Sequence, residues 1–227
     1  PQAMQRGITL TLVLAAAVGL CSLVLFAHAS QYPFAQLALW LGLVGVSCGA
    51  GAFLYTTHLS RLALGDVMVL IFFGLIPVGG TYFLLTDHLT LPALLLGLSI
   101  GLVVDLLLVI NNFRDRDNDA RVKKRTLVVY LGERYTLAFY LLLGVGALLL
   151  LFALCYHLPT SFSNVWVQYL PAFVPLIFLP LHLHTWQELK RIRHGRALNA
   201  LLGATSRNIL LFALSFCVGL LLQSCLQ

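Results

Sequence analysis

Long apolar stretches separated by short polar breaks dominate the pattern of this chain. An α-helix needs roughly 20 apolar residues to cross a bilayer. Lipid offers no hydrogen-bond partner to an open backbone, so each such stretch is expected to be helical. The pattern therefore predicts an all-α, polytopic transmembrane helix bundle with seven spans, at residues 7–29, 33–55, 67–86, 91–110, 135–156, 165–184 and 206–223.

The distribution of basic residues supports this topology. Arg6 precedes the first span, Arg61 lies between the second and third, and the other Lys and Arg residues lie at 114–134 and 190–207. The intervening connections contain no Lys or Arg. Basic residues concentrate in cytoplasmic loops, so this alternation places residue 1 inside and residue 227 outside.

Composition excludes a water-soluble fold. The 227 residues are 60% hydrophobic and 10% charged, with a mean hydropathy of +0.93, whereas soluble domains carry about 25% charged residues. The net charge of +6 would suggest nucleic acid in a soluble protein. Here loop topology accounts for it, so we expect a lipid bilayer and no nucleic acid as partners.

Small residues and prolines inside the spans carry structural expectations. Glycines four residues apart let helices approach closely, and prolines remove a backbone donor and favour kinks. The positions are Gly45, Gly49, Gly97, Gly101, Pro77, Pro171, Pro175 and Pro180.

The polar segment after the fourth span carries the candidate chemistry. Asn111, Asp115 and Asp119 are spaced i, i+4, i+8, so they share one face if the helix continues out of the membrane. Two carboxylates and an amide oxygen suit Mg²⁺, which is usually held by one or two carboxylates plus substrate phosphates. Lys124 and Arg125 follow and could meet the remaining phosphate charge. The alternative is a solvated, salt-bridged helix end.

Two further acidic residues lie at or within spans. Asp105 is seven residues before Asn112 and therefore points the same way. A carboxylate at membrane depth costs roughly 2.5–3.5 kcal/mol, which favours a function or a pairing; a hydrogen-bonded packing role is the alternative. Asp66 opens the third span and either caps that helix or lines the same cavity.

These segments resemble the UbiA superfamily of membrane prenyltransferases. Residues 111–119, N-N-F-R-D-R-D-N-D, followed by K-R-T-L-V-V-Y-L-G-E at 124–133, resemble the family's second aspartate-rich motif. The version is closest to that of 1,4-dihydroxy-2-naphthoate polyprenyltransferases. M-Q-R-G at 4–7, and L-G-D at 64–66 followed by F-F-G at 72–74 and G-G-T-Y at 79–82, resemble the segments before that family's third and fifth helices.

The resemblance implies a nine-helix fold around a cavity that opens to lipid. It implies Mg²⁺-dependent transfer of a polyprenyl chain from its diphosphate to 1,4-dihydroxy-2-naphthoate, with decarboxylation, toward menaquinone in a bacterial inner membrane with cytoplasmic active-site loops. Metal ligands would be Asn111, Asp115 and Asp119. Lys124 and Arg125 would stabilise the leaving group beside these carboxylates. The other substrate-binding candidates are Asn112, Arg114, Asp105 and Asp66.

The chain also departs from the family pattern. The family's first motif, N-D-x-x-D-x-x-x-D, is absent from the 227 residues, so we expect one prenyltransferase domain, 1–227, that lacks the first two helices and this motif. The usual Gly of G-K-R-T is Lys123, which predicts an altered turn. The alternatives are 4-hydroxybenzoate or a haem precursor as acceptor, a transporter built around Asp105, and a non-catalytic membrane protein.

Overall fold

The computed structural model describes residues 2–29, 33–57, 62–158 and 164–226. These residues form an all-helical structure, in which six helices are long and apolar enough to cross a membrane. The predicted polytopic helix bundle is therefore confirmed, and the chain is an integral membrane protein. It divides into two compact units, residues 1–53 and 54–227, which are described separately.

The first unit is built from two long apolar helices. Helix α1 runs over Gln2–Ala29, and α2 over Phe34–Thr57 extends a few residues into the second unit, matching the predicted spans closely. A Cβ atom added to Gly45 or Gly49 would meet no described atom within 4 Å. The close helix packing expected at this pair therefore has no counterpart in the described part of the chain.

The third predicted span is one continuous but locally widened helical run. It consists of α3 (Gly65–Val69), the π-helical turn η2 (Leu70–Leu75) and α4 (Ile76–Thr86). Pro77 lies two residues after this turn and has no backbone N–H to offer, so the carbonyl four residues earlier, that of Phe73, has no usual α-helical partner. A π-turn at this point accommodates the missing bond.

A glycine seam holds this run against α5 (Leu91–Arg121). A Cβ added to Gly74 would lie 2.4 Å from the Gly97 carbonyl oxygen and 2.8 Å from the Gly101 Cα. A Cβ on Gly101 would lie 3.0 Å from the Leu70 Cα. Backbones approach this closely only where side chains are absent, so the predicted role of Gly97 and Gly101 is confirmed.

Helix α5 is the centre of the second unit. It begins at Thr90, whose hydroxyl accepts a 3.4 Å hydrogen bond from the Ala93 N–H. Its 31 residues span about 46 Å at 1.5 Å per residue, against about 30 Å of hydrocarbon. The helix therefore continues beyond the apolar stretch that ends at residue 110, as predicted. We call the end of the second unit that contains residues 111–121 its polar end.

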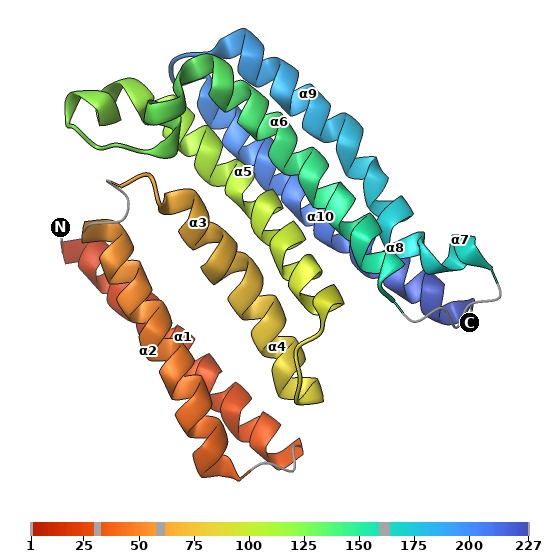
Figure 1. Cartoon of the computed structure of the whole chain (residues 1–227). Helices are drawn as coiled ribbons and strands as arrows, with labels where there is room; N and C mark the ends of the chain where they lie inside the picture. The colour runs from red at the N-terminus through yellow and green to blue at the C-terminus, as the bar shows by residue number, and fades with distance from the viewer. Residues whose placement is uncertain (1, 30–32, 58–61, 159–163, 227) are drawn as a thin grey trace. The chain divides into compact units, whose positions relative to one another are not determined.

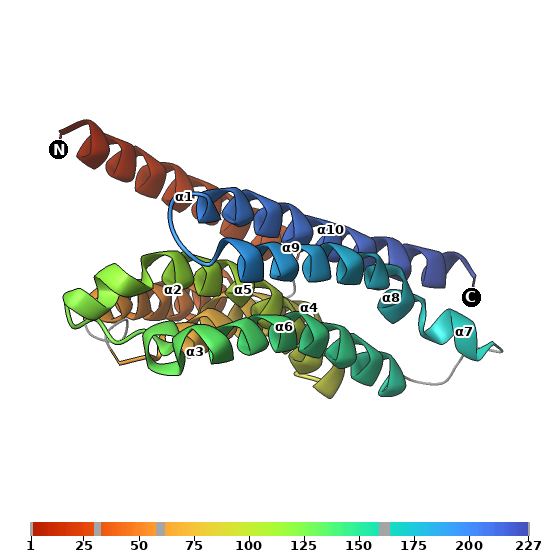
Figure 2. The same cartoon turned by 90° about the horizontal axis from the view of Figure 1, so that it is seen from above.

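Two long helices and the shorter α9 (Phe178–Ile192) complete the bundle around α5. Helix α6 covers Leu127–Tyr156 and α10 covers Leu198–Cys225. Figure 1 shows α5 between α3–α4 on one side and α6 with α10 on the other, and Figure 2 shows α9 lying along α10. Fully buried side chains fill the space between these helices; among them are Val109, Phe113, Tyr140, Phe178 and Phe212.

The sixth predicted span is not a single helix, which corrects that prediction. It is divided into α7 (Val165–Gln168), α8 (Leu170–Phe173), the 3-10 turn η3 (Val174–Ile177) and α9 (Phe178–Ile192). Pro171 and Pro175 lie at the starts of α8 and η3, where a proline fits but a preceding helix cannot continue. Together the four pieces still run from one end of the unit to the other (Figure 1).

Side-chain amides satisfy backbone groups near this break. The Gln168 amide donates to the Cys155 carbonyl at 2.8 Å, and the Gln223 amide donates to the Gln168 carbonyl at 3.0 Å. All of these groups are buried. Irregular backbone at membrane depth is tolerated where neighbouring helices supply such partners.

Candidate active site

The candidate site begins where α5 ends. The Lys124 N–H donates to the Asp119 carbonyl at 2.8 Å and the Lys123 N–H to the Ala120 carbonyl at 3.1 Å, the paired bonds of a Schellman motif. Lys123 takes the left-handed conformation, with φ of 57°, that this motif normally gives to glycine. The turn therefore forms although Lys123 replaces glycine. It brings the Lys124 ammonium to 3.1 Å from an Asp119 carboxylate oxygen.

A second ion pair organises the first half of the motif. The Arg114 guanidinium donates to both oxygens of Asp115, at 2.8 and 2.7 Å, and to the Asn111 side-chain oxygen at 2.8 Å. It also reaches the side-chain oxygen of Asn199 in α10, at 2.9 Å. Such two-point arginine–carboxylate contacts fix geometry. Arg114 thus holds Asn111 and Asp115 in place and ties them to α10.

The candidate ligands differ in exposure. Asn112 and Asp119 are buried, whereas Asn111 and Asp115 are half-buried and the Arg125 side chain is exposed. The Arg125 carbonyl accepts a 2.8 Å hydrogen bond from the Ala63 N–H. This bond joins the segment before α3 to the segment after α5, so both segments lie beside the site at the polar end of the second unit.

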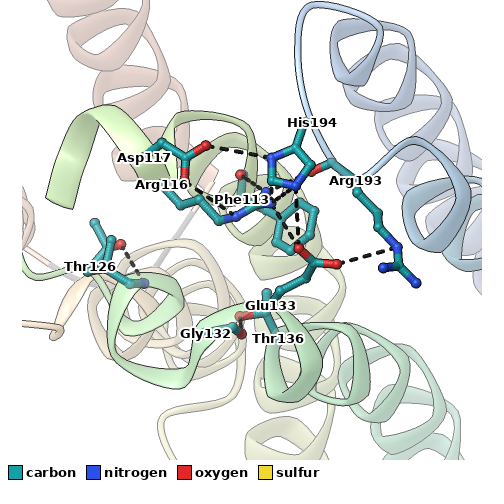
Figure 3. Close-up of polar contacts among 10 residues, drawn as sticks. Phe113, Arg116, Asp117, Thr126, Gly132, Glu133, Thr136, Arg193 and His194 are labelled. Atoms are coloured by element: carbon teal, nitrogen blue, oxygen red, sulfur yellow. Dashed lines mark hydrogen bonds and ion pairs between the residues drawn. The ribbon is translucent and has the colours of Figure 1, made fainter. Parts of the chain in front are cut away.

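The opposite side of the α5 extension is anchored by Arg116, as Figure 3 shows. Its guanidinium donates to the Glu133 carboxylate at 3.1 Å and to the Arg193 carbonyl at 2.7 Å, and contacts the His194 ring at 2.8 Å. It also stacks over the Phe113 ring, 4.1 Å from the centroid. Arg116 therefore joins α5, α6 and the connection between α9 and α10.

Gly132 turns the chain so that Glu133 can reach this cluster. Its φ of 72° and ψ of 177° interrupt α6, and only glycine adopts that combination readily. The helix then restarts, with the Thr136 hydroxyl donating to the Gly132 carbonyl at 2.7 Å (Figure 3). Glu133 consequently faces Arg116 and lies 3.4 Å from Arg193.

Asp66 and Asp105 lie farther from the polar end of the unit than the motif does. They are 5% and 1% exposed, and neither carboxyl group accepts a hydrogen bond from another described residue. Asp66 therefore does not cap α3, which begins after Leu64 without a side-chain cap. The alternative of a hydrogen-bonded packing role for Asp105 likewise has no described partner to support it.

Comparison with known proteins places the chain in a family. The model of the UbiA prenyltransferase family matches residues 5–202. The chain belongs to this family. The chain is 38% identical over 135 residues to the 1,4-dihydroxy-2-naphthoate octaprenyltransferase of Haemophilus influenzae, an alignment that covers 56% of this chain and 41% of that protein. No solved structure matches it significantly.

Two further relatives of this UbiA-family chain carry the same name. The Mycobacterium leprae protein is 31% identical over 181 residues, covering 78% of this chain and 57% of the relative. The Escherichia coli K12 protein is 32% identical over 228 residues, covering 98% and 69%. The chain thus spans 41% and 57% of the first two relatives and about two thirds of the third.

The UbiA-type motif offers donors that fit Mg²⁺ only together with a phosphate ligand. In the described ranges no group of three His, Cys, Asp or Glu side chains lies close enough to hold a metal alone. Asn111, Asp115 and Asp119 supply the hard oxygens that Mg²⁺ prefers, and Arg114 and Lys124 now occupy them. An arriving magnesium diphosphate would match both the carboxylates and these cations.

The sequence did not predict the residues that hold the motif in place through hydrogen bonds. These residues are Arg116, Arg193, His194 and Asn199, and their hydrogen bonds join segments up to 85 positions apart. No spacing rule connects such segments. One signal was available: Arg116 follows Asn112 by four residues, so it shares a helix face with a motif residue.

Proposed function

We propose that the protein containing this chain transfers a polyprenyl group from polyprenyl diphosphate to 1,4-dihydroxy-2-naphthoate, with decarboxylation, giving demethylmenaquinone. Family membership gives the reaction class. The names of the similar proteins support the naphthoate acceptor. The observation that carries the proposal is the pairing of Asp115 with Arg114 and of Asp119 with Lys124 at the end of a membrane helix.

In this proposal the polar end of the second unit binds the diphosphate. Asn111, Asp115 and Asp119 would hold Mg²⁺, which would supply positive charge to the phosphate groups. Arg114 positions two of these ligands through the hydrogen bonds described above. Asn112 adds a buried amide next to them.

Lys124 and Arg125 would take up negative charge as the diphosphate leaves. The Schellman turn fixes the Lys124 ammonium beside Asp119, so the cation is in place before the reaction. Arg125 is exposed and free to turn toward an incoming phosphate. Preorganised charge of this kind stabilises a transition state without reorganisation during the step. The allylic cation left behind is attacked by the electron-rich acceptor ring held next to it.

The proposed setting is a bacterial cell membrane with the polar end facing the cytoplasm. The polar connections at 114–134 and 190–207 meet at this end, through Arg116 and Arg193. The connection that follows α4 lies at the opposite end of the unit (Figure 1). This grouping supports the orientation derived from the basic residues.

The first experiment tests the acceptor. Membranes from cells that express the complete gene product containing this chain are incubated with a polyprenyl diphosphate, Mg²⁺ and either 1,4-dihydroxy-2-naphthoate or 4-hydroxybenzoate. Prenylated product is expected with the naphthoate only, and none after chelation of divalent cations. Product from 4-hydroxybenzoate instead would refute the naphthoate assignment.

The second experiment tests the diphosphate site in the same membranes. The double variant D115N/D119N is expected to lower turnover by at least about 10²-fold, since it removes charge that positions the reacting group. Asp117→Asn is the matched control, because Asp117 lies on the same helix with its side chain 68% exposed. Equal turnover in the double variant and the control would refute the proposed role of the motif.

A further inference from the structure

Asp66 and Asp105 form a pair with no task in the diphosphate site. Each carboxyl group has both oxygens buried without a hydrogen bond from another described residue. The two carboxyl groups make no hydrogen bond to each other, and their relative position follows from the packing of the two helices that carry them. Burying a carboxyl group without a partner is costly, and such a cost is retained where a ligand needs the group.

The glycine seam sets the level at which the two carboxyl groups face each other. Gly101 of α5 packs on Leu70 of the antiparallel run α3–η2–α4. One helical turn toward the polar end leads from Gly101 to Asp105 and from Leu70 to Asp66. The pair therefore lies at one level between the two helices.

The pair is set back from the diphosphate motif along α5. Asp105 precedes Asn112 by seven residues, which is about 10 Å along a helix axis. Both side chains lie on the same face. A ligand that contacts the pair therefore extends from the membrane interior toward the motif.

The chemistry of the pair favours a hydroxyl group over a metal ion. Two carboxyl groups are few for a cation that takes six or more oxygen ligands, and the described residues add no third acidic, His or Cys side chain. A hydroxyl donates to a carboxylate and accepts from a carboxylic acid, so it satisfies the pair in either protonation state. Val109 lies one helical turn from Asp105 on the same face of α5 and is fully buried in the apolar core, which suits an aromatic ring.

We propose that Asp66 and Asp105 bind the phenolic hydroxyl groups of the aromatic acceptor and so orient its ring toward the diphosphate-bound chain. This inference rests on the proposed function, because it assigns the acceptor half of the same site. It gives the two residues a positioning role that is separate from diphosphate and metal binding.

The test removes one hydroxyl group of the acceptor and one carboxylate of the protein, separately and together. The complete gene product is purified in detergent, and KM and kcat are measured with 1,4-dihydroxy-2-naphthoate and with 1-hydroxy-2-naphthoate, which lacks one hydroxyl. The proteins compared are the wild type, Asp66→Asn, Asp105→Asn and the exposed control Asp117→Asn. Thermal stability of each protein is measured in parallel.

We expect that the effect of removing one acceptor hydroxyl group depends on whether the carboxylate is present. The wild type and the control should prefer the dihydroxy acceptor by at least about tenfold in kcat/KM, the size of one hydrogen bond to a charged group. In each pair variant that preference should fall to about twofold. The KM for polyprenyl diphosphate should stay within about twofold of the wild-type value. Thermal stability should not fall, since each variant replaces a buried carboxyl group that has no hydrogen-bond partner among the described residues.

Distinct outcomes overturn the inference and the proposed function. An active wild type whose acceptor preference is unchanged in Asp66→Asn and Asp105→Asn overturns the inference alone. So does a loss of diphosphate affinity equal to the loss of acceptor affinity, or a loss of Mg²⁺ binding measured in the presence of inorganic diphosphate. A wild type that forms no product from 1,4-dihydroxy-2-naphthoate overturns the proposed function and the inference with it.

Discussion

The close approach of α5 to the preceding run predicts a large effect from one methyl group. Gly74 faces the α5 backbone, and a Cβ there would lie 2.4 Å from the Gly97 carbonyl oxygen and 2.8 Å from the Gly101 Cα. Favourable contacts between heavy atoms lie at about 3.5–4.0 Å. The variant Gly74→Ala must therefore move the two helices apart by about 1 Å, because backbone atoms cannot turn aside as side chains do.

The magnitude follows from comparison with a neighbouring glycine. Gly80 lies in α4, is exposed, and has nothing within 4 Å of an added Cβ. Both glycines lie in helical turns, Gly74 in the π-turn and Gly80 in α4, so the difference between the two substitutions reports mainly the steric term. Overpacking costs about 1–3 kcal/mol. Gly74→Ala should therefore unfold about 2–12 °C below Gly80→Ala, at about 2–4 °C per kcal/mol for a chain of this size.

The assay is thermal unfolding of the two purified variants in the same detergent, followed by intrinsic fluorescence and by loss of soluble protein. Turnover at low temperature provides a second readout, because separation of the helices also displaces Asp66 from Asp105. Equal midpoints for Gly74→Ala and Gly80→Ala would show that the glycine seam is not in close contact. The placement of Asp66 and Asp105 at one level between the two helices would then lose its support.

Three other substitutions test the supports of the site, each by the same thermal measurement. Arg116→Ala should lower stability by about 2–3 kcal/mol, since Arg116 is buried and makes charged hydrogen bonds. Exposed Arg121→Ala should be neutral within about 0.5 kcal/mol, and similar losses in the two variants would contradict the anchoring role of Arg116. Gly132→Ala should cost about 1–3 kcal/mol from backbone strain alone. The control Gly203→Ala lies in a helix, also without close neighbours, and should not be destabilised. Equal stability of the two variants would exclude the positive-φ conformation of Gly132. Lys123→Gly should raise stability by about 0.5–1 kcal/mol by relieving the left-handed residue, and a loss of stability would show that the Lys123 side chain contributes contacts of its own.

The sequence alone determined the features that depend on local chemistry. Apolar length located the spans, because transfer into lipid depends on composition more than on neighbours. Helical spacing correctly placed Asn111, Asp115 and Asp119 on a helix that continues past the membrane. The Gly97–Gly101 pair correctly indicated close packing, since small side chains have one main use at that spacing. The roles assigned to the site residues remain predictions.

Only the tertiary structure decided which distant segments meet. The sixth span kept its apolar length yet is divided into four pieces. Gln223 of α10 donates to the Gln168 carbonyl of the broken backbone, a tertiary contact that hydropathy cannot detect. The anchoring of Arg116 by Arg193 and the level shared by Asp66 and Asp105 also arise from helix packing. Contacts between residues tens of positions apart depend on the register of two helix surfaces, and each sequence segment encodes only its own surface.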